Sequence, residues 1–114
     1  MSPKAVGTKL KAPRHLRRAT RSWWEQIADE YRMESHHLRL LTLAGEAWDR
    51  LSEAREAIAA AGAYYVNKKG EPRSHPALAI ERDSRIAFAR LLRELNLDPD
   101  MPEAYARPPR LGAK

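Results

Sequence analysis

The residues with the clearest chemistry in this chain are basic, and they gather in two short stretches. The first 21 residues contain no acid, and seven lysines and arginines: Lys4, Lys9, Lys11, Arg14, Arg17, Arg18 and Arg21. A second stretch holds Lys68, Lys69 and Arg73. Such clusters are typical of contacts with the phosphates of nucleic acid or with another anionic surface. We predict that both stretches bind DNA. The alternative for the first stretch is a solvated tail that binds nothing.

The rest of the composition indicates one small domain in which positive and negative charges are nearly equal in number. The chain has 114 residues and a net charge of +6, of which residues 22–100 contribute −3 and residues 101–114 contribute +2. It has no cysteine, which fits a reducing cytoplasm. No apolar run approaches the roughly 20 residues of a membrane helix, so we expect no membrane partner.

Residues suited to catalysis or metal binding are scarce. None of the five glycines stands in a Gly-x-x-x-x-Gly-Lys phosphate loop, and no serine stands in a nucleophile elbow. His36 and His37 are adjacent, so they point to different sides of a helix and cannot chelate together. We therefore expect a binding or assembly protein that is not an enzyme and needs no cofactor or metal ion.

Apolar periodicity predicts a mainly α-helical fold. We expect three helices, at about residues 17–33, 35–61 and 75–95, and a small β-hairpin at about residues 63–73, with flexible termini. The predicted domains are a disordered basic arm (1–16), a helical DNA-binding and oligomerisation domain (17–98) and a flexible tail rich in proline and arginine (99–114).

The first helix has two candidate starts. Residue 17 is one, and Ser22 is favoured because Ser22 and Glu25 have capping-box spacing. Trp23 shares a face with Ile27 and Tyr31, which follow at intervals of four. We expect Trp23 and Trp48 in the core, whereas Trp24 is less clearly assigned.

The second helix carries two apolar stripes, which is more than one partner helix can cover. Ser35 is its expected N-cap and Gly62 its expected C-cap. Exposed apolar patches usually mark interfaces, so we predict self-association, with burial of both stripes in the monomer as the alternative. The predicted interface residues are Leu40, Leu43, Ala47, Trp48, Leu51, Ala54 and Ile58.

The connection to the third helix contains strand and turn residues. Tyr64-Tyr65-Val66 has strand propensity, residues 67–70 can form a turn, and residues 71–73 can pair back. Ser74 or His75 then caps a third helix that ends near Asn96. We expect Lys68, Lys69 and Arg73 to project from one edge of each subunit, with lysines that serve only solubility as the alternative.

Several short motifs together resemble the small subunits of phage terminases. They are Gly45-Glu46-Ala47-Trp48-Asp49-Arg50-Leu51, Ala54-Arg55, Ile58 and Gly62, followed by a hairpin with Gly70, His75-Pro76-Ala77-Leu78, Leu91-Leu92 and Leu97-Asp98-Pro99, with Leu16 and Trp24 upstream. The similarity covers about residues 13 to 100. The sequence departs from the family where Asn96-Leu97-Asp98-Pro99 replaces a Gly-Leu-Thr-Pro stretch followed closely by arginines.

The resemblance implies a non-enzymatic factor that acts in the host cytoplasm. Such proteins recognise double-stranded viral DNA, assemble into homo-oligomeric rings, and present the DNA to the large terminase subunit, which carries the ATPase and nuclease. Two other functions remain open from the residues alone. One is a small dimeric transcriptional regulator, with a helix-turn-helix at Met33–Ser35, and the other is a basic adaptor for RNA or protein.

Overall fold

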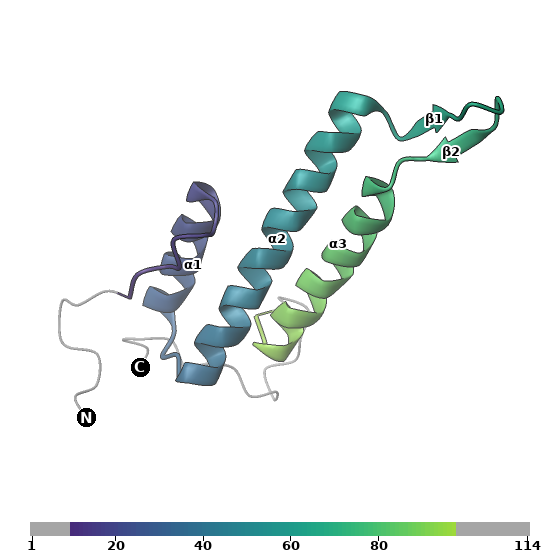
Figure 1. Ribbon diagram of the computed structural model, residues 1–114. Helices are drawn as coiled ribbons and strands as arrows, with labels where there is room; N and C mark the ends of the chain where they lie inside the picture. Colours follow the sequence, from purple (N-terminus) through teal and green to yellow (C-terminus); the bar gives the residue numbers. More distant parts are fainter. Residues whose placement is uncertain (1–9, 98–114) are drawn as a thin grey trace.

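Three helices and one β-hairpin make up residues 10–97, the part of the chain that the computed structural model describes (Figure 1). The elements are α1 (Arg18–Glu30), α2 (Ser35–Ala61), β1 (Tyr64–Val66), β2 (Pro72–Ser74) and α3 (Ala77–Glu94). The predicted fold class is therefore confirmed. The predictions for Lys4, Lys9 and the tail at 99–114 lie outside the described residues.

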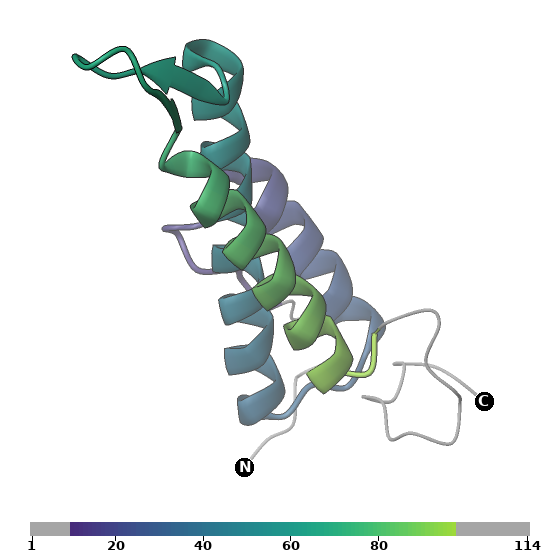
Figure 2. The ribbon, with the colours of Figure 1, turned by 90° about the vertical axis from the view of Figure 1, so that its right-hand side faces the viewer.

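The long helix α2 is the element against which the other two helices pack. α3 runs back along α2 in the most extensive helix pairing, and α1 packs on α2 over a shorter length (Figures 1 and 2). Side chains of α1 donate hydrogen bonds to Asp49 and Thr42 of α2, and α1 does not extend to the hairpin end of α2 (Figure 1). Among residues 10–97, α3 is the helix that packs along the hairpin end of α2.

The core lies where all three helices meet. Leu16, Trp24, Ala28, Leu41 and Leu95 are buried there, and they come from the start of the described chain, α1, α2 and the end of α3. Burying such side chains stabilises the fold by roughly 1.5–3 kcal/mol for each large one. The core therefore joins the end of α3 to α1 through a cluster centred on α2.

Local signals define three of the helix ends. α2 ends at Gly62, which has a φ of +88°, as predicted. α3 ends with Asn96 at a φ of +58°, where the Leu97 N–H donates to the Leu92 carbonyl oxygen at 2.8 Å. This is the bonding of a Schellman cap. At the start of α2 the predicted N-cap Ser35 was wrong, because Glu34 is the N-cap.

His37 completes the cap of α2. The Glu34 N–H donates to His37 Nδ1 at 3.1 Å, and the Glu34 side chain accepts the backbone N–H of His37. Partial burial, together with neighbouring His36, lowers the pKa of His37. The neutral ring that accepts this hydrogen bond is therefore favoured.

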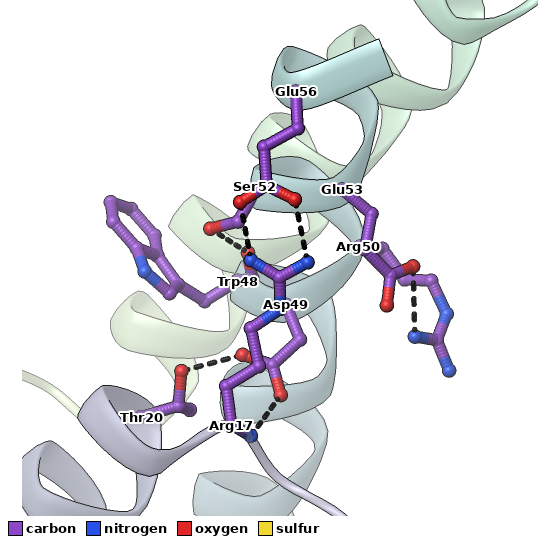
Figure 3. Close-up of polar contacts among 8 residues, drawn as sticks. All are labelled: Arg17, Thr20, Trp48, Asp49, Arg50, Ser52, Glu53 and Glu56. Carbon is purple, nitrogen blue, oxygen red and sulfur yellow. Dashed lines mark hydrogen bonds and ion pairs between the residues drawn. The ribbon is translucent and has the colours of Figure 1, made fainter.

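The start of α1 is set by a side chain of α2 rather than by a local cap. Asp49 is buried, and it accepts the Arg17 N–H at 2.9 Å and the Thr20 hydroxyl at 2.5 Å (Figure 3). A carboxylate at a helix N-terminus also interacts favourably with the helix dipole. The predicted range that begins at about residue 17 is confirmed. The later start at Ser22, which the capping-box spacing favoured, was wrong, because the side chain that holds this helix start lies 29 residues away along the chain from Thr20.

Gly45 allows α1 and α2 to come close beside this contact. A Cβ added at Gly45 would lie 3.1 Å from Leu16 Cδ1 and 3.2 Å from Thr20 Cγ2. Both neighbours are buried, so neither side chain has room to move. The absence of a side chain at this position thus sets the spacing of the two helices.

The tryptophans occupy different environments from those predicted. Trp24 is the buried one, and its Nε1 donates to the Thr42 hydroxyl at 3.2 Å, whereas Trp23 is half-buried and Trp48 is 40% exposed. The core face of α1 is Thr20, Trp24 and Ala28. The assignment of Trp48 to the core was therefore wrong, whereas Trp23 is partly buried and packs against the core. The fully buried stripe of α1 lies one residue away from the predicted one.

The ordered body also begins earlier than the expected boundary at residue 17. Within the arm expected at 1–16, Ala12 and Leu16 are buried in the core. The Ala12 N–H donates to Glu25 Oε2 at 3.0 Å. The described part of this arm is therefore packed on α1 and α2, in contrast to the expected disorder.

We predict that Asp49→Ala destabilises the protein by about 2 kcal/mol, because it leaves the Arg17 N–H and the Thr20 hydroxyl without their acceptor in a buried site. Chemical denaturation followed by circular dichroism measures this loss. Asp83→Ala is the matched control, since Asp83 is exposed and its pairing with Arg82 lies on the surface. Equal stability of the two variants would contradict the role assigned to Asp49.

Candidate nucleic-acid interface

Three basic residues of the predicted DNA-binding set lie together near the start of α1. Lys11, Arg14 and Arg21 line one open hollow, with Glu25 as its single acidic residue. Arg21 also donates to the carbonyl oxygens of Arg14 and Leu16, at 3.1 and 3.2 Å. Arg21 thus holds the turn before α1 as well as contributing charge.

Arg17 and Arg18 are neighbours with different surroundings. Arg18 is exposed, so its guanidinium is accessible to a phosphate. Arg17 instead forms a bidentate ion pair with Glu56, with nitrogen–oxygen distances of 2.8 and 2.9 Å (Figure 3). The hydrogen bond from Arg17 lowers the pKa of Glu56 and raises the pKa of Arg17. Arg17 must leave this partner before it can bind a phosphate in the same way.

The second basic cluster stands at the tip of the β-hairpin. The turn is closed by the Gly70 N–H, which donates to the Asn67 carbonyl oxygen at 3.0 Å, with a φ of +80° at Gly70. Asn67 Oδ1 accepts the backbone N–H groups of Lys69 and Glu71 at 2.9 and 3.0 Å. These bonds fix the turn, and the side chains of Lys68 and Lys69 are exposed on it.

Arg73 lies on the returning strand, opposite Tyr65. It is exposed and makes a weak surface pair with Glu71 at 3.4 Å. The structure thus brings Lys68, Lys69 and Arg73 together on one hairpin. This hairpin projects from the helices at the junction of α2 and α3, away from the start of α1 (Figure 1). One subunit therefore presents two separate basic surfaces.

The predicted interface residues of α2 divide into exposed and buried groups. Leu51 and Ala54 are buried within the subunit, where they contribute to the core and have little surface for a partner. Leu40, Ala47 and Ile58 are half-buried. Leu43 and Trp48 remain exposed, so they are the members of the set that are most accessible to another chain.

An apolar groove, which the sequence interpretation missed, lies between the helices beside Trp48. It encloses about 470 Å³ and is lined by Ala19, Thr20, Trp23, Trp48, Phe88 and Leu92. The ring centroid of Phe88 lies 5.8 Å from that of Trp23 and 5.0 Å from that of Trp48. Each helix supplies one of the three aromatic side chains. We call this surface the aromatic groove.

The acidic and histidine side chains of residues 10–97 do not gather at one place. Within residues 10–97 no group of three or more histidine, aspartate or glutamate side chains is placed to hold a metal ion. In the same range, no helix is both long enough and apolar enough to cross a membrane.

Comparison with known proteins identifies one family. The family model described as the small subunit of phage terminase matches residues 20–107, which is most of the chain. Neither the curated proteins nor the solved structures give a match. The matched range includes α1 from Thr20 onward, and all of α2, the hairpin and α3.

We predict that Arg17→Gln raises the pKa of Glu56 to its ordinary value, because the substitution removes the hydrogen bonds that lower it. The folded pKa of Glu56 lies below its unfolded value of about 4.3. The pair therefore stabilises the fold above that pH, and its contribution is lost as the pH falls through the lowered folded pKa. An NMR titration of the Glu56 carboxyl carbon in both proteins measures the change.

The control for this titration is Arg50→Gln, which breaks a different surface pair, with Glu53. It should leave the titration of Glu56 unchanged. If Glu56 titrates identically in the wild type and in Arg17→Gln, the ion pair does not form in solution.

Proposed function

Because the chain belongs to the family of phage terminase small subunits, we propose that it is an oligomeric DNA-binding factor for viral genome packaging. In this proposal it recognises double-stranded viral DNA and presents it to the large terminase subunit in the host cytoplasm. The large subunit supplies the ATPase and nuclease, and this chain acts without catalysing a reaction. The family match over residues 20–107 is the observation that carries the proposal.

The basic hairpin supports a role in DNA binding. Its lysines are exposed on a turn that Asn67 fixes. Two or three charges per subunit give only a weak phosphate contact. In a ring the contact repeats with the symmetry, and multivalent binding multiplies weak contacts into strong ones.

The exposed apolar surface supports self-association. Four large apolar side chains of the helices are 40–49% exposed: Leu43 and Trp48 on α2, and Ile80 and Ile86 on α3. A subunit of this size that leaves several large apolar side chains accessible is suited to burying them against neighbouring chains. The proposed assembly is a homo-oligomeric ring.

The junction between α1 and α2 does not form a helix-turn-helix. In that motif two helices cross at about 90–120°. Here the contacts of Arg17 with Glu56, Thr20 with Asp49 and Trp24 with Thr42 align α1 antiparallel to α2. The regulator considered from the sequence therefore lacks its reading element at Met33–Ser35.

We predict that the purified protein is a closed assembly of many subunits at near-physiological salt. Light scattering coupled to size exclusion gives the native mass, which should be a fixed multiple of 13.0 kDa. The mass should also stay constant over a wide range of protein concentration, as a closed ring requires. A monomer or a dimer would contradict the ring.

We predict that Lys68→Glu with Lys69→Glu weakens binding to duplex DNA and flattens its salt dependence. Each phosphate contact contributes about 0.9 to the slope of log K against log salt concentration. Fluorescence anisotropy at several salt concentrations measures the slope. The matched control is Arg32→Glu with Arg39→Glu, an equal charge change on exposed residues at the other end of α2. An unchanged slope in the hairpin variant would exclude a phosphate contact there.

A further inference from the structure

The β-hairpin has two chemically different faces, and the strand register defines them. Tyr64 pairs with Ser74, Tyr65 with Arg73, and Val66 with Pro72. Side chains alternate between the faces along a strand, and directly opposed residues share a face. One face therefore carries Tyr64, Val66, Pro72 and Ser74, and the other carries Tyr65 and Arg73. We call the first the uncharged face.

The uncharged face has no partner within the described part of the subunit. Tyr64 is 69% exposed and Val66 is 68% exposed, and all six strand residues are classed as exposed. A two-stranded hairpin alone is at best marginally stable in water. A tyrosine, a valine and a proline on one uncharged face form the kind of surface that is buried at protein interfaces.

The aromatic groove is a matching surface on the same chain. Trp23, Trp48 and Phe88 give it apolar walls that are open to solvent on one side. The hairpin of the same subunit does not reach it, because Trp48 lies 13 residues before the end of α2, which is about 20 Å along the helix axis. The hairpin also projects away from the helices (Figures 1 and 2). If the uncharged face of a hairpin fills the aromatic groove, that hairpin must therefore belong to a second copy of the chain.

We propose that the uncharged face of the hairpin of one subunit docks in the aromatic groove of the next. This inference rests on the ring of the proposed function and names the contact that builds it. The two surfaces are different, so the contact is heterologous and joins subunits head to tail. A head-to-tail contact whose rotation closes generates a ring.

The geometry of the hairpin keeps its basic residues outside this contact. Lys68 and Lys69 lie in the turn, and Arg73 lies on the opposite face. Docking of Tyr64 and Val66 therefore leaves these charges accessible. One hairpin thus contacts the neighbouring subunit through its uncharged face and retains its tip for DNA.

Adjacent tyrosines provide a matched test of the docking. Tyr64→Ser removes an aromatic ring from the uncharged face, whereas Tyr65→Ser removes one from the other face of the same strand. We expect Tyr64→Ser to weaken assembly at least about tenfold, as for an interface tyrosine, and Tyr65→Ser to keep the wild-type native mass. Tyr64→Ser combined with Val66→Ser should have the mass of a single chain, 13.0 kDa. Circular dichroism confirms the helical fold of each variant.

Cross-linking tests the groove directly, because the chain contains no cysteine. Val66→Cys and Ala19→Cys are prepared as separate proteins, since Val66 lies on the uncharged face and Ala19 lines the groove. When the two are mixed under oxidising conditions, we expect a disulfide between the two different chains and little linkage within either protein alone. Tyr65→Cys in place of Val66→Cys should give a lower yield.

The outcomes separate this inference from the proposed function. If the wild type forms a ring but Tyr64→Ser with Val66→Ser keeps the full native mass and no mixed disulfide forms, the docking is wrong and the ring stands. In that case the groove has another occupant. If the wild type is a monomer, the ring and the docking both fail, while DNA binding is measured independently by anisotropy.

Discussion

A buried carboxylate in the middle of α2 holds the start of α1, and the packing of α1 on α2 depends on it. Asp49 accepts the hydrogen bonds of Arg17 and Thr20, while Gly45, one turn away, lets the two helices come close. Four residues further on along α1, Trp24 enters the core. Of the cationic side chains in the described residues, Lys11, Arg14 and Arg21 therefore lie against the packed pair of α1 and α2.

The limited length of α1 explains why the subunit exposes apolar surface. α1 has 13 residues and α2 has 27, so α1 shields only part of its partner. Beside α1 the three helices leave the aromatic groove, and beyond it α2 and α3 continue as a pair that ends in the hairpin. A small chain that built a closed core would need a longer α1. Exposed apolar side chains therefore remain both beside α1, at Leu43 and Trp48, and near the hairpin, at Ile80.

The sequence predicts those parts of the fold that depend on local signals. Gly62 and Asn96 stop their helices through backbone conformations that favour these residue types, and the turn at 67–70 follows from its composition. The buried face of α1 was predicted incorrectly because Thr20 is polar, and a polar residue is not expected in a core. Thr20 is nevertheless buried, since its hydroxyl donates a hydrogen bond to the buried Asp49 of α2. Their pairing depends on residues 29 positions apart, so no local pattern indicates it. A four-residue spacing of Leu16, Thr20, Trp24 and Ala28 is the signal that was available.

In the proposed docking, the placement of the hairpin would link assembly to DNA binding. An exposed two-stranded hairpin gains little stability from its own contacts, so burial of its uncharged face against a neighbour would order the strands and the turn together. The turn carries Lys68 and Lys69, and an ordered turn presents them at lower entropic cost to a phosphate. Under the proposed docking an unassembled chain would bind DNA more weakly, because it lacks the multivalency of a ring and the support of a neighbour for its two strands. One contact would then supply both properties.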